Sequence, residues 1–267
     1  MFRFLATDLD GTLLTTTKQI SVATQRTLIA AQERGLRVIL ASGRPLYSML
    51  PFAEQLQLPR FGGFIIGYNG SLVWDCANVK ALRQLTIPME LIPQLATFAT
   101  PGFNVMAYKG NAIVTENTDD HWGQHIAAIN KMPFLQVDSF VDAITELQHK
   151  CLFTGAPRRL WHLERKLNRI FAGQLSAYRS ENFLLEVVPC GIDKAQALSF
   201  LLDRVGGTSD ELICCGDGFN DLPMMKLAGL SCATRNAQLP VKQAAMVVTD
   251  SNDKDGVANI VRQYVLQ

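Results

Sequence analysis

Two carboxylates lie two residues apart at the end of an apolar run near the start of the chain. Asp8 and Asp10 follow the apolar residues 4–6, and a second acidic pair, Asp217 and Asp221, follows a later apolar run at 212–215. Like charges 4 Å apart repel by about 4 kcal/mol at an effective dielectric near 20, so a site that unites these acids holds a divalent cation or keeps some carboxyls protonated. Ligands that are all oxygen indicate Mg²⁺.

Two further polar segments follow predicted strands or begin predicted helices. Ser42-Gly43-Arg44 comes directly before Pro45, and its hydroxyl and backbone N–H groups at a helix start form a natural anion site. Lys194 lies near the start of another predicted helix. Taken alone, the Ser42-Gly43-Arg44 segment is typical of the start of any helix. Taken alone, Lys194 is typical of a solvated surface lysine. Their significance comes from where the fold would place them.

Short apolar runs alternate with helical periodicity at both ends of the chain, which predicts a doubly wound, Rossmann-like α/β fold with a parallel sheet. Ser21 is an expected N-cap and Gly35 an expected C′ residue for the first helix. In such a sheet, ligands bind outside the carboxyl ends of the strands, where the polar segments should meet. The expected strands are 2–6, 38–41, 64–66, 212–215, 231–233 and 246–248, and the expected helices are 21–34, one from about 45, 194–204 and 223–229.

The pattern changes between the two halves of this sheet, which predicts an inserted α+β domain. The expected domains are residues 1–82 (first part of the core), 83–186 (inserted domain) and 187–267 (second part of the core). Within the insertion the sequence predicts strands at 104–108 and 112–115 and helices at 141–149 and 159–171.

Composition excludes several classes of protein. A hydrophobic fraction of 48% and a net charge of +1 describe a globular chain with no general attraction to nucleic acid or acidic membranes. The six cysteines lack the spacing of a disulfide scaffold, and no apolar stretch is long enough to span a membrane. We therefore expect a cytoplasmic protein with reduced thiols. The oligomeric state stays open, and a monomer is compatible with the sequence.

The four segments together resemble the haloacid dehalogenase superfamily. The match consists of D-x-D-G-T at 8–12, S-G-R at 42–44, a lysine at 194 and G-D-x-x-N-D at 216–221, in the order and spacing of that family. The large insertion is similar to the family's type IIB cap, which narrows the resemblance to the Cof-like sugar-phosphate and cofactor-phosphate phosphatases. Two details depart from the usual pattern: Ala195 follows the lysine, and Arg235 stands where many relatives carry a small residue.

The resemblance implies a magnesium-dependent phosphatase that acts on a small phosphorylated substrate. Asp8 would be the nucleophile and Asp10 the general acid and base, each a role that suits a carboxyl group. Mg²⁺ would be held by Asp8, the backbone carbonyl of Asp10 and Asp217, while Asp221 supports the metal or orients Lys194. The groups expected to bind the phosphoryl oxygens are Ser42, the N–H groups of Leu9 and Gly43, Lys194 and the Asn220 amide.

Two other functions use the same residues. A mutase would pass the phosphoryl group to another hydroxyl, and a non-catalytic phosphate-binding module would have kept only the fold. Outside the constellation, His121 and His125 could share one helical face as metal ligands, although Gly123 weakens that helix. Cys214 and Cys215 are expected in the core. Arg158-Arg159 and Tyr108-Lys109 are expected at a solvated rim or in contact with an anionic substrate.

Overall fold

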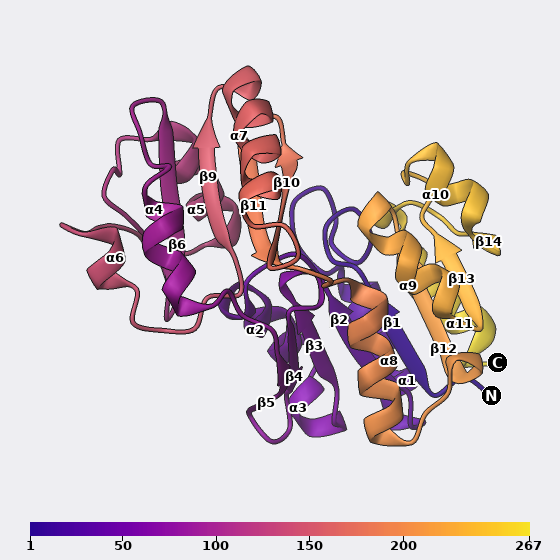
Figure 1. The fold of residues 1–267 in the computed structure, drawn as a ribbon. Helices are drawn as coiled ribbons and strands as arrows, with labels where there is room; N and C mark the ends of the chain where they lie inside the picture. The colour runs from indigo at the N-terminus through magenta and orange to yellow at the C-terminus, as the bar shows by residue number, and fades with distance from the viewer. The chain divides into compact units, whose positions relative to one another are not determined.

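The computed structural model describes residues 1–267 and divides into two compact units (Figure 1). The core comprises Met1–Arg83 and Asp193–Gln267, and the cap comprises Gln84–Ile192. The second boundary lies later than the predicted break after residue 186. That break would cut through strand β11 (Leu184–Pro189), which pairs with cap strands on both of its edges.

The core is an α/β unit built on an eight-stranded sheet with the order β14-β13-β12-β1-β2-β3-β4-β5. Strands β14 through β3 in this order run parallel, and β4 is antiparallel to β3. The two sequence halves meet where β1 pairs with β12, which places the first and last acidic motifs on neighbouring strands. The strands are β1 (Phe4–Thr7), β2 (Arg37–Ala41), β3 (Phe64–Gly67), β4 (Leu72–Asp75), β5 (Lys80–Gln84), β12 (Leu212–Gly216), β13 (Leu230–Ala233) and β14 (Val247–Val248).

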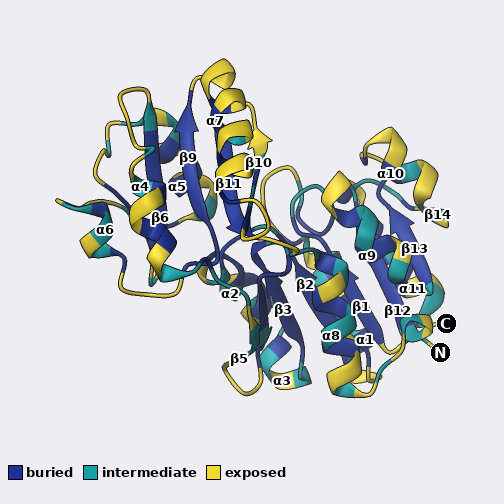
Figure 2. Ribbon diagram, viewed as in Figure 1, coloured by how far each residue is buried: buried dark blue, intermediate teal, exposed yellow.

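Helices cover both faces of this sheet, as the doubly wound fold class predicts. Leu5 of β1 packs in one apolar cluster with α1, α2 and α11, whereas Phe4 and Ala6 pack in the other cluster with α8 and α9. Figure 2 shows the strands in the middle of this sheet as buried, whereas the edge strands β5 and β14 are partly exposed. The helices of the core are α1 (Val22–Glu33), α2 (Leu46–Gln55), α3 (Leu58–Phe61), α8 (Lys194–Val205), α9 (Leu222–Leu227), α10 (Leu239–Ala244) and α11 (Gly256–Tyr264), with 3₁₀ turns η1 (Tyr68–Gly70), η3 (Ser209–Glu211), η4 (Phe219–Asp221) and η5 (Asn252–Lys254).

The ends of α1 follow the expected capping chemistry. The hydroxyl of Ser21 accepts a hydrogen bond from the Thr24 N–H at 3.0 Å, which satisfies one of the free donors of the first turn. Gly35, just past the last turn, has φ +96°, a left-handed conformation that glycine adopts without steric cost.

The cap is an α+β unit with its own apolar core. Its six-stranded sheet has the order β10-β11-β9-β6-β7-β8 and is antiparallel except for the β7–β8 pair. The remaining elements are β6 (Phe103–Lys109), β7 (Ala112–Thr115), β8 (Phe134–Gln136), β9 (Cys151–Gly155), β10 (Leu175–Glu181), η2 (Met89–Leu91), α4 (Ile92–Ala96), α5 (His121–Asn130), α6 (Phe140–Ala143) and α7 (Pro157–Ile170). None of the helices in either unit combines the length and apolarity required to cross a membrane.

The prediction of a helix over residues 141–149 is wrong. The helix α6 ends at Ala143, and the chain then runs without helix to β9. The buried side chain of Gln148 explains the difference, because it accepts from the Tyr108 N–H at 3.1 Å and donates to the Tyr108 carbonyl at 2.8 Å. The backbone carbonyl of Gln148 also accepts from the Ile87 N–H at 2.7 Å. These contacts replace the helical hydrogen bonds of this segment.

Candidate active site

Lys194 lies at the centre of the predicted constellation. It is the first residue of α8, whose N-cap Asp193 accepts from the Gln196 N–H at 2.7 Å. Only 1% of Lys194 is exposed, and its Nζ donates to Asp8 Oδ1 and to Asp221 Oδ1, each at 2.6 Å. One buried ammonium therefore joins the carboxylate after β1 to the carboxylate after β12.

Both carboxylate oxygens of Asp221 accept hydrogen bonds. Besides the bond from Lys194 to its Oδ1, its Oδ2 accepts from the backbone N–H groups of Asp217 and Gly218, both at 3.0 Å. The residue is entirely buried. Its contacts fix both the lysine and the turn that carries Asp217, so its geometry fits a supporting role better than that of a direct metal ligand.

Asp217 lies against the first acidic motif. Its Oδ1 accepts from the Thr12 hydroxyl at 2.7 Å, and its carboxylate packs directly against Gly11. A side chain at residue 11 would overlap that carboxylate, and the φ of +81° at this position also favours glycine. The Gly11 carbonyl in turn accepts from the Asn236 amide at 2.7 Å, which anchors the turn to a third segment of the core.

The carboxyl oxygens of Asp8, Asp217 and Asp221 lie within 4.8 Å of one another. With the ammonium of Lys194 among them, the ionised cluster carries two net negative charges, which one divalent cation would neutralise. The donor set is all oxygen and therefore fits a hard ion such as Mg²⁺. The residues present thus fit the metal that the sequence predicts.

Burial and charge set the ionisation of this cluster. Burial raises the pKa of Asp8 to about 8, because desolvation together with Asp221 and Asp217 outweighs the attraction of Lys194. Burial alone would lower the pKa of Lys194, but Asp8 and Asp221 more than compensate, and its pKa lies above the ordinary value. Burial also raises the pKa of Asp217, in opposition to the hydrogen bond from Thr12. The lysine is therefore the constant charge of the site, and the carboxylates need a second cation to ionise fully.

Asp10 has a different environment. Arg44 donates to it through Nε at 2.6 Å and through Nη2 at 2.7 Å, and Lys18 donates to Oδ1 at 2.7 Å. Burial opposes the ionisation of Asp10, but these two cations outweigh it and hold its pKa below the ordinary value. Arg44 is not among the predicted catalytic residues, yet it binds the residue expected to be the acid and base.

The expected phosphate-binding segments are joined through Asn69, which sequence reasoning missed. Its backbone N–H donates to the Ser42 carbonyl at 2.9 Å, its side chain lies beside Gly43, and its Oδ1 accepts from the Asn220 amide at 3.2 Å. Asn69 has φ +57° and is the second residue after β3. Its position after a parallel strand is the signal that could have found it, since the same rule identified the other segments. Leu9 is buried, and its carbonyl accepts from the Leu14 N–H at 2.8 Å in the turn after β1.

The candidate residues outside the predicted catalytic constellation form no second site. His121 and His125 are exposed on α5, and their rings contact Trp122 and Phe183 respectively rather than each other. Cys214 and Cys215 are fully buried, as expected of core residues. In the cap, Arg158 and Arg159 are exposed, whereas Tyr108 is buried and therefore not part of a solvated rim.

Known proteins resemble the whole chain. A crystal structure of a haloacid dehalogenase-like hydrolase from Bacteroides thetaiotaomicron has 41% sequence identity and a TM-score of 0.96, over 98% of this chain and 99% of that one. The 5-amino-6-(5-phospho-D-ribitylamino)uracil phosphatase YcsE of Bacillus subtilis is 30% identical over 99% of this chain and 96% of its own length. The pyridoxal phosphate phosphatase YbhA of Escherichia coli is 25% identical over 99% of both chains. Residues 5–261 match the family described as haloacid dehalogenase-like hydrolase, and the chain belongs to that family.

Proposed function

We propose that the protein hydrolyses a small phosphomonoester with Mg²⁺, through an aspartyl-phosphate on Asp8. The observation that carries the proposal is the bridge of Lys194 between Asp8 and Asp221 inside a cluster of carboxyl oxygens less than 4.8 Å across. Lys194 holds one oxygen of Asp8 and leaves the other for attack. A buried, oriented carboxylate beside a fixed cation is suited to nucleophilic catalysis on an anionic ester.

In the first step an oxygen of Asp8 bonds to phosphorus while the bond from phosphorus to the ester oxygen breaks. Asp10 gives its proton to the departing alkoxide, and an alcohol leaves. Arg44 and Lys18 lower the pKa of Asp10 and favour its ionised form. The incoming phosphoryl group adds negative charge beside Asp10, which raises its pKa and favours the protonated form that this step needs.

In the second step water attacks the phosphorus of the aspartyl-phosphate. Asp10, now a carboxylate, accepts the proton of the water, the bond between phosphorus and the Asp8 oxygen breaks, and inorganic phosphate leaves. The carboxylate of Asp8 and the proton on Asp10 are thereby restored. Ser42, the N–H groups of Leu9 and Gly43, Asn220 and Lys194 bind the phosphoryl oxygens in both steps. Asp8, the Asp10 carbonyl and Asp217 would hold Mg²⁺, which when bound supplies positive charge against the phosphoryl oxygens.

The names of two relatives support the substrate class. Both the ribitylaminouracil phosphatase and the pyridoxal phosphate phosphatase are named for phosphate esters of small molecules. We infer that this protein also acts on a phosphorylated cofactor, cofactor precursor or sugar.

The test is phosphate release from a panel of such esters in the presence of Mg²⁺, with Asp8→Asn beside the wild type. We expect Asp8→Asn to lower turnover by at least about 1000-fold while the far-UV circular dichroism is unchanged, because the substitution removes the nucleophile and little volume. Asp203→Asn, an exposed residue of α8, is the matched control.

Acid quenching with ³²P-labelled ester should trap label on the wild type and none on Asp8→Asn. Full activity in Asp8→Asn would exclude the proposed nucleophile. An isomerised ester formed without free phosphate would instead assign the site to a mutase.

A further inference from the structure

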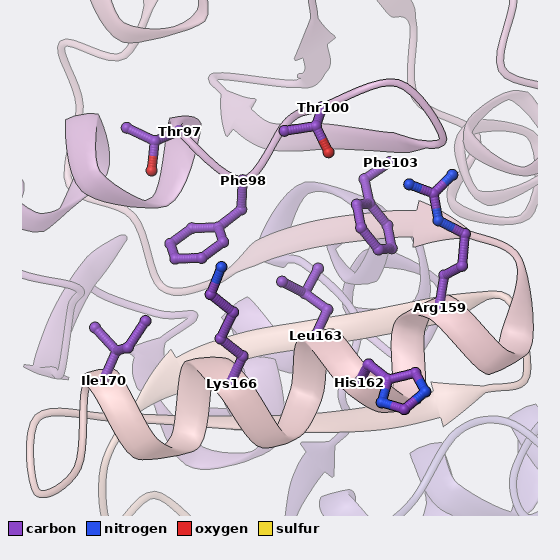
Figure 3. A pocket seen from close by; sticks show the side chains of 9 residues that line it. All are labelled: Thr97, Phe98, Thr100, Phe103, Arg159, His162, Leu163, Lys166 and Ile170. Carbon is purple, nitrogen blue, oxygen red and sulfur yellow. The ribbon is translucent and has the colours of Figure 1, made fainter.

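The cap contains a pocket whose lining includes no residue of the proposed catalytic set. Its volume is about 550 Å³, which lies in the range of small-molecule sites. One wall is helix α7, and the opposite wall is the segment from residue 97 to residue 103 (Figure 3). Both walls belong to the cap, so the pocket is complete within that unit.

The floor and sides of the pocket are apolar and aromatic. Leu163 of α7 lies between the rings of Phe98 and Phe103, which come from the opposite wall (Figure 3). Ile170 extends the apolar surface and is 49% exposed. Exposed apolar surface inside a hollow of this size is typical of a binding site.

Two cations stand beside the rings. The Lys166 Nζ lies 5.0 Å from the ring centroid of Phe98, and the Arg159 Cζ lies 4.8 Å from that of Phe103. Arg159 also donates to the Pro101 carbonyl at 2.8 Å, which fixes its guanidinium at the rim. The two residues are seven apart on α7, about 10 Å along the helix axis.

No carboxylate neutralises either cation. The only acidic residue of α7 is Glu164, and it pairs with Arg179 at 2.8 Å. Neither Lys166 nor Arg159 takes part in an ion pair in the described chain. The pocket therefore joins an apolar, aromatic interior to uncompensated positive charge at its rim.

We propose that this pocket binds a small aromatic anion. The aromatic body lies on Leu163 between Phe98 and Phe103, where stacking and apolar contact hold it. The anionic group pairs with the Lys166 ammonium at one end of the pocket, while Arg159, at the other end, adds attraction at longer range. The pocket shares no residue with the proposed catalytic set, and binding there requires neither Mg²⁺ nor turnover.

The experiment is a fluorescence titration of the full-length protein with 8-anilinonaphthalene-1-sulfonate, an aromatic sulfonate that a phosphatase cannot hydrolyse. The double variant Arg159→Gln/Lys166→Gln should raise the Kd by about tenfold or more, since it removes the charge-assisted contact with Lys166 and the longer-range attraction of Arg159. The matched control is Arg158→Gln/Arg165→Gln, which makes the same change of charge on the same helix outside the pocket, and its Kd should equal that of the wild type.

Two further measurements distinguish the contribution of the charge to the affinity from that of the aromatic rings. The neutral analogue N-phenyl-1-naphthylamine should bind at least about tenfold more weakly than the sulfonate, and millimolar inorganic phosphate should fail to displace the sulfonate. Equal affinity of the pocket variant and the control variant would overturn the proposal. So would equal binding of the neutral analogue, or displacement by phosphate alone.

Discussion

Arg44 engages Asp10 through two separate nitrogens, Nε and Nη2. A guanidinium can hold a carboxylate in this two-point manner, whereas a lysine offers a single point of charge. The interaction fixes the direction of the Asp10 side chain and keeps its pKa low. Arg44 therefore affects the proposed acid and base without touching the reacting atoms.

We expect Arg44→Gln to shift the limb of the kcat/KM pH profile that belongs to Asp10 to higher pH by about one unit, because the removed cation no longer stabilises the carboxylate. Arg44→Lys should shift it less, since the charge remains but the two-point contact is lost. Arg37→Gln, an exposed arginine at the opposite end of β2, is the control. A profile that Arg44→Gln leaves unchanged would contradict this role.

Gly11 is the second residue with a measurable consequence. We expect Gly11→Ala to weaken Mg²⁺ binding by about tenfold or more, because the added methyl group displaces the Asp217 carboxylate. Isothermal titration with MgCl₂ measures this directly. Gly35→Ala has a similar positive φ but nothing within 4 Å of the added atom, so it should cost about 1 kcal/mol of stability and leave Mg²⁺ affinity intact. Equal Mg²⁺ affinity in Gly11→Ala and the wild type would refute this prediction.

At the residue scale the sequence predicted that the acids and Lys194 lie together, as they do, but it missed the contacts that Arg44, Lys18, Thr12 and Asn69 make with the predicted residues. Asp8, Lys194 and Asp217 stand in recognisable motifs, and buried charges require a shared site. Thr12 and Asn69 act through hydrogen bonds that depend on side-chain direction and, for Asn69, on a left-handed backbone. Nothing in the spacing of residues along the chain specifies such contacts, so the folded structure was needed to find them.

Among the elements, segments with a clear helical or strand periodicity of apolar residues were predicted well, and the segment 144–149 was not. Helix α1 and strand β7 agree with the expected ranges to within a residue, because capping groups or turns bound them on both sides. The segment after α6 has residues that favour helix, but the buried amide of Gln148 bonds the backbone of β6 instead. A tertiary contact overrides local propensity here.

The role of Gln148 can be tested by its removal. We expect Gln148→Ala to destabilise the cap by about 2–4 kcal/mol, since it leaves the backbone N–H and carbonyl of Tyr108 buried without these partners. Hydrogen exchange of the β6 amides should show a corresponding loss of protection. Leu147→Ala, at a residue that is 56% exposed, should have little effect. Protection of β6 that survives in Gln148→Ala would show that the amide is dispensable.

For the whole molecule, the acidic cluster links stability to pH. Without metal, the pKa of Asp8 is 3.8 in the unfolded chain and about 8 in the folded one, so the folded protein binds more protons between these values. Its free energy of unfolding therefore falls as pH rises through that window. Thermal unfolding in EDTA should show Tm decreasing from about pH 4 to about pH 8 by more in the wild type than in Asp8→Asn, and MgCl₂ should reduce the decrease. Parallel curves for the two proteins would disprove the linkage.

The pairing of β1 with β12 has a further consequence for how the protein is made. A ribosome that adds roughly 5–20 residues per second completes β1 some 10–40 s before Asp217. Through that interval the nascent core has an open edge on its central strand, whereas the cap, with an apolar core of its own, has its complete sequence before β12 is made. A polypeptide released before β12 would carry the nucleophile without its lysine or its metal ligand in place, so under the proposed mechanism catalytic competence arises only with the last third of translation.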